Sequence, residues 1–403
     1  MLIPDDRRVT GTETGSAAPL PLRDVRVLDL SLLLPGPFCT QMLADLGADV
    51  IKVEPPGGDY ARRMPSELFA VANRNKRSVV LDLKRPADHA ALLRIAAAAD
   101  VAVEGFRPGV TGRLGVGYED LRRVRPDIVY CSLSGYGQSG PMSQEPGHDG
   151  NYLAAGGALS FSGHWLEPPR RSGVPVADLA GASFAAVSVM AALHRRALTG
   201  QGTYLDVSLA DSVLSFATVR AGARLDLAND GRRHLYPTND LFTTGDGEVL
   251  AIGVVEDHFW DKLRKALGPD CPELLDARFD TESGRHQNGD SLKRLLDDTF
   301  ARRPAGEWMA ELRRHDVPAQ RVLTVAEAAG QPQVRSRGIV AERDGQRHVV
   351  FPVLDGGLPM GRLSSLAPEL GAHTSEVLRE FGVPGADIDA ITGRADGVLP
   401  RRI

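Results

Sequence analysis

Short apolar runs alternate with longer segments of helical spacing between residues 25 and 133. The runs predict strands at 25–30, 49–54, 78–83, 101–106 and 127–133, and the segments at 38–47 and 87–100 predict helices. This alternation is typical of a parallel sheet covered by helices on both faces. Ligands bind such sheets at the loops that leave the strands. The first of these loops, SLLLPGPF, lacks Gly-x-Gly-x-x-Gly, so a nicotinamide dinucleotide is not expected.

The pattern changes after residue 150. Residues 151–227 are rich in Ala, Leu and Ser and predict helices, most clearly at 184–202, where basic residues and then glycines mark a helix end. A hairpin with Gly-Asp-Gly at its turn is predicted within 236–255. Helices follow to about residue 315, then a loop-rich region with a strand at 348–354 and a helix at 375–382.

The fold class predicted from these patterns is α/β. A large domain is built from both ends of the 403-residue chain, and a smaller α+β domain is inserted into it. We expect a disordered lead-in at 1–22, the first part of the large domain at 23–227, the small domain at 228–330 and a return to the large domain at 331–403.

Composition limits the partners. The formal net charge of −5 gives no nucleic-acid footprint. No run reaches the roughly 18 apolar residues of a membrane span, and the first 20 residues lack a hydrophobic signal region. The three cysteines are too scattered for a disulfide framework or a zinc site. We expect a cytoplasmic protein with reduced thiols that binds neither nucleic acid nor membrane.

Residues 145–160, EPGHDGNYLAAGGALS, place His148 where a helix is predicted to begin. The unpaired N–H groups of a helix start stabilise an anionic oxygen. An imidazole there can move a proton while those groups hold the resulting oxyanion, which suits enolate chemistry beside a carbonyl. The alternative is that His148 only caps or packs the helix.

Two acids are further candidates. Asp178, in GVPVADLAGASF, is an N-cap, a general base or a nucleophile that forms an acyl anhydride, and the pattern alone favours the N-cap. Glu256, in AIGVVEDHFW, is either a partner that orients a histidine or an acid favoured at a helix start. The cations Arg74, Lys76 and Arg107 stand near strand ends and suit phosphate groups, with surface charge as the alternative.

An ordered series of motifs resembles one family from about residue 22 to residue 398. The motifs are VRVLDLSLLLPGPFCTQMLADLGADVIKVEPPGGD, NKRSVVLDLK, EGFRPGVTGRLGVGYEDL, PDIVYCSLSGYGQSGP, DLAGASFAAVSVMAALHRRALTGQG and LGAHTSEVLREFG. The chain is similar to the family III coenzyme A transferases (CaiB/BaiF), which include the α-methylacyl-CoA racemases. The resemblance implies a Rossmann-like large domain, a homodimer of interlocked subunits and an acyl-CoA thioester as substrate.

The family contains two chemistries. Its transferases use the aspartate at the Asp178 position as a nucleophile, whereas its racemases use that aspartate as an acid/base together with the histidine of a GHDxNY motif. A glutamate of the small domain supports that histidine. This chain reads GHDGNY at 147–152, EGF at 104–106 where transferases often have ENF, and PGPFC at 35–39, all of which resemble the racemase branch.

The resemblance therefore implies a racemase or epimerase that inverts the α-carbon of a 2-methylacyl-CoA through an enolate. His148 and Asp178 exchange the roles of base and acid, and Glu256 orients His148. Backbone N–H groups near Asp149 hold the oxyanion. The predicted substrate-binding residues are Asp149, Asn151 and Tyr152, and the predicted coenzyme A contacts are Arg74, Lys76 and Arg107.

No metal and no cofactor beyond the coenzyme A of the substrate is expected. A coenzyme A transferase with Asp178 as nucleophile and a non-catalytic acyl-CoA-binding protein are the alternatives. The sequence departs from the racemase pattern at Asn239 and Phe242, where pocket tyrosines are usual, and at Pro55–Pro56, where an arginine often follows the strand.

Overall fold

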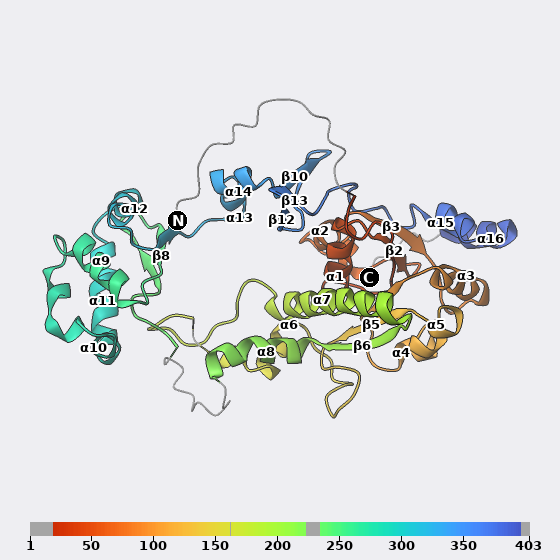
Figure 1. The fold of residues 1–403 in the computed structure, drawn as a ribbon, viewed down its shortest axis with the longest axis horizontal. Helices are drawn as coiled ribbons and strands as arrows, with labels where there is room; N and C mark the ends of the chain where they lie inside the picture. The colour runs from red at the N-terminus through yellow and green to blue at the C-terminus, as the bar shows by residue number, and fades with distance from the viewer. Residues whose placement is uncertain (1–18, 162, 223–233, 396–403) are drawn as a thin grey trace.

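The computed structural model describes residues 19–161, 163–222 and 234–395. Its centre is a six-stranded parallel sheet in the order β3-β2-β1-β4-β5-β6, which is a Rossmann-like arrangement (Figure 1). The strand order reverses between β1 and β4, so the crevice at their carboxyl ends is where a ligand is expected. The strands are β1 (Arg26–Asp29), β2 (Asp49–Glu54), β3 (Lys76–Val80), β4 (Val101–Glu104), β5 (Val129–Ser134) and β6 (Thr203–Ser208).

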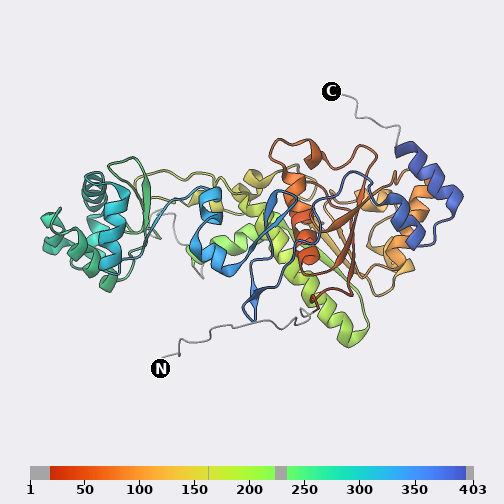
Figure 2. The same cartoon turned by 90° about the horizontal axis from the view of Figure 1, so that it is seen from above.

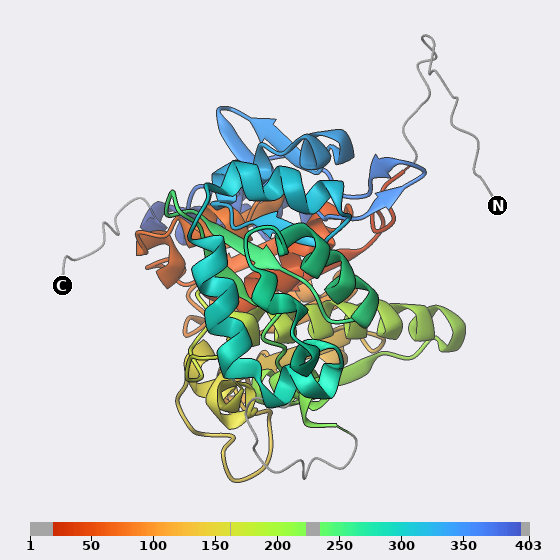
Figure 3. The same ribbon diagram turned by 90° about the vertical axis from the view of Figure 1, so that its left-hand side faces the viewer.

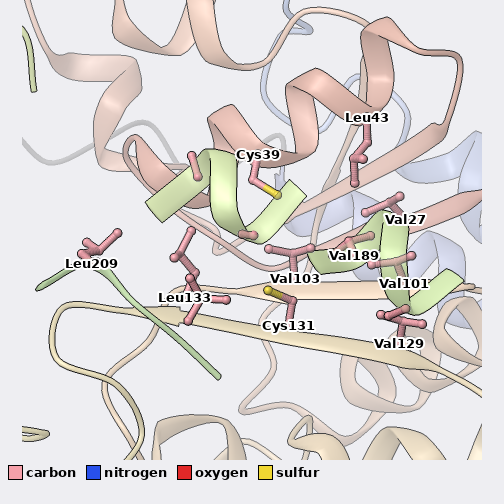
Figure 4. Packing of buried hydrophobic residues seen from close by; sticks show 14 of the residues in the cluster. Val27, Cys39, Leu43, Val101, Val103, Val129, Cys131, Leu133, Val189 and Leu209 are labelled. Atoms are coloured by element: carbon pink, nitrogen blue, oxygen red, sulfur yellow. The ribbon is translucent and has the colours of Figure 1, made fainter. Parts of the chain in front are cut away.

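Helices cover both faces of this sheet because its strands are apolar on both sides. Helices α1 (Pro35–Asp45) and α7 (Val176–Thr199) pack on one face, where Cys39 and Val189 meet strand residues such as Val103 (Figure 4). The other face is covered by α3 (Pro86–Ala97), α5 (Tyr118–Val124), α15 (Thr374–Glu380) and α16 (Gly385–Ala395). Short helices α2 (Leu68–Ala72) and α4 (Val110–Arg113) and the 3-10 turn η1 (Tyr60–Arg63) lie in the connections.

The region 151–227, expected to be helical throughout, contains a strand. It holds α6 (Asp149–Ala155), the 3-10 turn η2 (Ala158–Ser160), α7, β6 and α8 (Leu209–Ala221). Strand β6 pairs in parallel with β5 and forms an edge of the sheet. The strand was not predicted because its sequence, TYLDVS, is only half apolar. Polar residues are tolerated there because part of this edge strand is exposed.

A second hydrophobic core lies beyond the sheet, in residues 241–321. Strands β7 (Leu241–Thr243), β8 (Val249–Ile252) and β9 (Ala319–Arg321) form an antiparallel sheet, and the predicted Gly-Asp-Gly hairpin joins β7 to β8. Helices α9 (Asp257–Leu267), α10 (Glu282–Gln287), α11 (Gly289–Phe300) and α12 (Ala305–Arg314) gather in this part of the fold, which faces the viewer in Figure 3. Its core contains Trp260, Phe300 and Trp308. Two 3-10 turns, η3 (Pro272–Leu275) and η4 (Ala277–Phe279), complete this part.

The chain then returns toward the large sheet (Figure 2). Helices α13 (Val325–Ala329) and α14 (Pro332–Arg337) lead into two small hairpins, and α15 and α16 follow. The hairpins are β10 (Val340–Arg343) with β11 (Gln346–Val349), and β12 (Leu354–Asp355) with β13 (Leu358–Pro359). The predicted boundary at 227/228 falls outside the described residues, and that at 330/331 stays a prediction.

Two further expectations concern the N-terminal lead-in and membrane-spanning segments. Leu22 is buried, and its N–H donates to Leu46 O at 2.9 Å, so this residue packs with the large domain, whereas the predicted boundary at 22/23 stays a prediction. Residues 1–18 lie outside the described residues. Helix α7 is long and apolar enough to cross a membrane by length and composition alone, although no such run was expected. In the fold it packs on β5 and β6, as a core helix does.

Candidate active site

A cavity of about 540 Å³ opens at the carboxyl ends of β1, β4 and β5, at the position where the strand order reverses. The turn after β1 supplies Leu32, Leu33 and Leu34, and the turn after β4 supplies 105–108. Residues of η1 and α2 and of the segment 143–148 also line the cavity. The cavity therefore lies where the fold predicts a ligand.

His148 and Asp178 both line this cavity. His148 is the residue immediately before α6, as the sequence predicted, and its side chain is exposed. Asp178 lies in the first turn of α7, with a half-buried side chain, and it is not the N-cap, which is Pro175. The structure thus brings the two candidate acid/base side chains into one cavity from two separate helix starts.

Asp149 connects these two helix starts. Its buried carboxylate accepts a hydrogen bond from Ala177 N at Oδ1 over 2.8 Å, and Arg171 Nη2 lies 3.3 Å from Oδ2. It therefore pairs a backbone N–H at the start of α7 that has no partner within the helix. The Asp149 side chain therefore joins the starts of α6 and α7, and the expected role of its backbone N–H in holding an oxyanion stays a prediction.

The electrostatics of the cavity favour a protonated Asp178. Burial and the nearby Asp149 carboxylate together raise the pKa of the Asp178 carboxyl to about 7, against the lowering effect of Arg171. A carboxyl group with a pKa near neutrality exchanges a proton readily with a substrate at physiological pH. Asp178 is therefore suited to act as an acid in one direction and as a base in the other.

Tyr152 forms part of the cavity wall below His148. Its hydroxyl donates to Gly147 O at 2.5 Å, and burial raises its pKa to about 12. The ring fits only because Gly135 and Gly147 carry no side chain, since a Cβ on either would come within 2.6 Å of the ring. Asn151 is exposed, and its Oδ1 accepts from His148 N at 3.0 Å, which fixes the backbone before α6.

Glu256 does not reach the cavity within one chain. It is exposed at the start of α9, in the part of the fold formed around Trp260, and it is absent from the cavity lining. Its predicted role in orienting His148 therefore has no support from contacts inside a single subunit. At the positions expected to carry tyrosines, Phe242 is buried in the same core and Asn239 is exposed.

The three predicted coenzyme A cations have different surroundings. Arg107 is exposed and lines the cavity. Arg74 is buried and forms an ion pair of 2.6 Å with Asp45. Lys76 is also buried and pairs with Asp29 at 2.9 Å, and burial lowers the pKa of its ammonium group to about 8. Both Arg74 and Lys76 already pair with buried carboxylates, so their surroundings give no support to the expected contacts with coenzyme A, which stay a prediction.

A second, mostly apolar cavity of about 180 Å³ adjoins the first, and the sequence analysis did not identify it. It lies at the carboxyl ends of β1 to β4, and Leu32 and Phe106 line both cavities. Lys84 stands at its rim in the VVLDLK segment, and Pro55 forms part of its wall. The position of Lys84 just after a predicted strand could have indicated it, but the sequence prediction named Arg74, Lys76 and Arg107 instead.

A metal site is not apparent. Within 19–161, 163–222 and 234–395, no group of three His, Cys, Asp or Glu side chains is placed to hold a metal ion. The three cysteines are buried and free, and burial raises the pKa of the Cys39 thiol to about 12.

Comparisons with known proteins agree on the family. The family model of CoA-transferase family III matches residues 22–374. An acetyl-CoA:oxalate CoA-transferase of Acetobacter aceti is 36% identical over 93% of this chain and 100% of its own length. The human α-methylacyl-CoA racemase is 34% identical over 91% of this chain and 95% of its own length.

Solved structures point the same way. A CaiB/BaiF family protein from Brucella suis superposes with a TM-score of 0.80 at 30% identity, covering 90% of this chain and 99% of that one. The strand order, the position of the cavity and these matches over nearly the whole chain lead to one conclusion: the chain belongs to CoA-transferase family III, whose members include both coenzyme A transferases and a racemase.

Proposed function

We propose that the protein is an acyl-CoA racemase or epimerase that inverts the carbon next to the thioester of a 2-methyl-branched acyl-CoA. The observation that carries the proposal is the meeting of His148 and Asp178 in one cavity. Inversion by proton transfer needs two acid/base groups on opposite faces of the α-carbon, because a single group would return the proton to the face it left. A transferase needs only the carboxylate.

The proposed reaction moves one proton at each of the two groups. When neutral His148 takes the α-proton from one face, protonated Asp178 gives a proton to the other face, and the reverse reaction exchanges these roles. The α-carbon's bonding electrons pass to the thioester oxygen in the enolate and return when the new C–H bond forms. Because the pKa of Asp178 is about 7, both of its protonation states are accessible near neutral pH.

Stabilising the enolate oxygen is the larger requirement. The start of α6 directs backbone N–H groups of Asp149 and Gly150 away from the helix, next to His148. In this proposal these groups donate to the thioester oxygen of the bound substrate. Tyr152 and Asn151 support this start, the former through Gly147 O and the latter through His148 N.

The two adjoining cavities suit the two ends of an acyl-CoA. In this proposal the acyl group and thioester occupy the main cavity, while the nucleotide lies against the smaller apolar cavity. Phosphate groups need cations, and Arg107 and Lys84 stand at the two cavities without being buried. Leu32 and Phe106, which line both cavities, would contact the chain that joins the two ends.

Glu256 can support His148 only from a second subunit, so the proposal includes the interlocked homodimer that the family resemblance implies. Helices α7 and α8 leave apolar side chains exposed in the single chain, among them Val187 (67% exposed) and Val219 (81%). Phe184 of α7 and Phe216 of α8 also stack at 5.6 Å between ring centroids and remain partly exposed. Such faces are normally covered by a partner.

A coenzyme A transferase is the second candidate, because most of the similar proteins are coenzyme A transferases. They include an acetyl-CoA:oxalate and a succinyl-CoA:glutarate CoA-transferase. In that reaction the Asp178 carboxylate attacks the thioester and releases coenzyme A thiolate, which then returns to the resulting anhydride. An ionised carboxylate is the better nucleophile, whereas burial favours the neutral form of Asp178.

The deciding experiment uses purified protein, one stereoisomer of a 2-methylacyl-CoA and D2O, without an acceptor carboxylate. Mass and chiral analysis follow deuterium uptake and inversion together. We expect both, and we expect His148→Ala to lose them by about 10²-fold or more while remaining folded. Coenzyme A transfer to an added carboxylate, with a hydroxylamine-trapped adduct on Asp178 and no α-exchange, would establish the transferase instead.

A further inference from the structure

The turn that follows β1 adopts a conformation that its sequence does not favour. Leu33 has a φ of +65°, in the left-handed region that large side chains rarely enter. Its neighbours on both sides, Leu32 and Leu34, line the main cavity with it. A strained residue persists only where the surroundings fix it, and such residues concentrate at functional sites. The question is which group holds this turn.

One buried ion pair holds both ends of the turn. Leu33 N lies 3.1 Å and 3.2 Å from the two carboxylate oxygens of Asp59. Lys52 Nζ donates to Ser31 O at 2.8 Å and lies 3.0 Å from Asp59 Oδ2. Both charged side chains are fully buried. The backbone from Ser31 to Leu33 is thus fixed through one carbonyl and one N–H.

The same carboxylate also fixes a second segment that lines the cavity. Asp59 Oδ1 accepts from Ala61 N at 2.9 Å and so caps the turn η1. Tyr60 of that turn and Met64, the residue after it, also line the main cavity. Asp59 therefore ties together two segments of the cavity lining, although it is buried and absent from the lining itself.

A buried ion pair contributes little to stability compared with an apolar pair of the same size, so stability alone gives a weak reason for this one. We propose that Asp59 is a positioning residue, which acts through Leu33 and Tyr60 to shape the cavity that binds the acyl-CoA thioester. The use of turnover as one measurement rests on the proposed function. The binding measurement does not depend on racemase activity.

The test compares two double variants that both lack the buried charges. Lys52→Met/Asp59→Asn keeps an oxygen that can accept from Leu33 N, whereas Lys52→Met/Asp59→Ala keeps none. Removing both charges together avoids leaving one buried and unpaired. A control double variant, Arg196→Met/Asp100→Asn, removes a 2.9 Å ion pair at the amino end of β4. The main cavity lies at the other end of the strands, their carboxyl ends. Thermal unfolding checks that each variant is folded at the assay temperature.

The measurements are calorimetric binding of a non-reactive thioether analogue of a 2-methylacyl-CoA, and kcat and KM for α-deuteration. We expect the Ala variant to lose about tenfold or more in affinity and in kcat, because small displacements of positioned groups are costly. The Asn variant should lose clearly less than the Ala variant, because Leu33 N keeps an acceptor, and the control should stay within about threefold of the unmodified protein.

Equal affinities and rates for the Ala and Asn variants would overturn the proposal, whether both match the unmodified protein or both are impaired. If the unmodified protein binds the analogue but exchanges no α-proton, the racemase proposal fails. Binding of the analogue alone then decides the positioning role. Weaker binding by the Ala variant than by the Asn variant supports the role, and equal binding by the two overturns it.

Discussion

Asp149 and Ala177 are joined by a hydrogen bond of 2.8 Å, and each is the chain neighbour of one candidate acid/base residue. His148 precedes Asp149, and Asp178 follows Ala177. One buried contact therefore sets the position of the α6 start relative to the α7 start. The separation of the two proton-transferring groups is controlled by a residue that need not touch the substrate with its side chain.

Replacing Asp149 with asparagine should move the pH dependence of the reaction. The Asp149 carboxylate is a like charge that raises the pKa of Asp178, so its removal lowers that pKa. We expect the limb of the pH–rate profile that reports Asp178 to shift toward lower pH. The amide oxygen can still accept from Ala177 N, so stability should change by less than about 1 kcal/mol.

Asp149→Ala provides the contrasting variant. It removes both the charge and the acceptor, leaving Ala177 N unpaired in a buried position, which costs about 1–3 kcal/mol of unfolding free energy. Urea unfolding of the two variants in parallel measures this difference. Equal stabilities would contradict the structural role assigned to the Asp149–Ala177 bond, and an unmoved profile in Asp149→Asn would contradict the electrostatic one.

Asp178→Asn should stabilise the fold at alkaline pH. The folded-state pKa of Asp178, about 7, lies above that of an unfolded aspartate. The stability that protonated Asp178 contributes is therefore fully present below the unfolded pKa and is lost as pH rises through about 7. At pH 8 the variant should gain about 1–3 kcal/mol relative to the unmodified protein, and near pH 4 the gain should vanish. Unfolding by urea at both values checks the sign, and a gain that is larger at pH 4 would refute it.

Gly135→Ala should disturb the wall that carries Tyr152. A Cβ at this position would lie 2.3 Å from Tyr152 Cε1, so the ring must move. We expect a loss of about 1–3 kcal/mol in unfolding free energy and a fall in α-deuteration, because Tyr152 supports the segment before α6. Gly112→Ala, where a new Cβ meets nothing within 4 Å, is the matched control and should leave both quantities near their original values.

Replacing Lys84 should weaken acyl-CoA binding, whereas replacing Lys76 should lower the stability of the fold. Lys84→Ala is expected to weaken acyl-CoA binding by about tenfold, with smaller loss at high salt, because it removes a cation at the rim of the apolar cavity. Lys76→Met leaves Asp29 buried and unpaired, which should cost about 3–5 kcal/mol of stability. Calorimetric titration and thermal unfolding of both variants separate the effects. Unchanged binding in Lys84→Ala would remove that residue from the coenzyme A site.

Much of the architecture could be predicted from the sequence, because five strands of the main sheet are short apolar runs with strong breaks. Strand β6 could not, since an edge strand keeps polar residues that resemble a helix or a loop. His148 could be placed at a helix start from local spacing, and α6 begins directly after it. That Asp178 shares its cavity depends on a contact made across a long stretch of chain, which only the family resemblance suggested.

The ion pairs of the buried cations could not be predicted for a similar reason. Arg74 and Asp45 are 29 residues apart, and Lys76 and Asp29 are 47 residues apart. No local pattern distinguishes a lysine that pairs with a distant buried aspartate from one that faces solvent. Glu256 presents the same difficulty, because its expected neighbour lies in another part of the fold.

The two cavities have only Leu32 and Phe106 in common. All other lining residues belong to one cavity, so mutations that reshape the side facing Tyr60 and Met64 need not alter the side facing Lys84. In the proposed binding mode, specificity for the acyl group can therefore evolve independently of nucleotide binding. Substitutions in the main cavity would change which acyl group is accepted, while the smaller cavity would continue to bind the coenzyme A nucleotide.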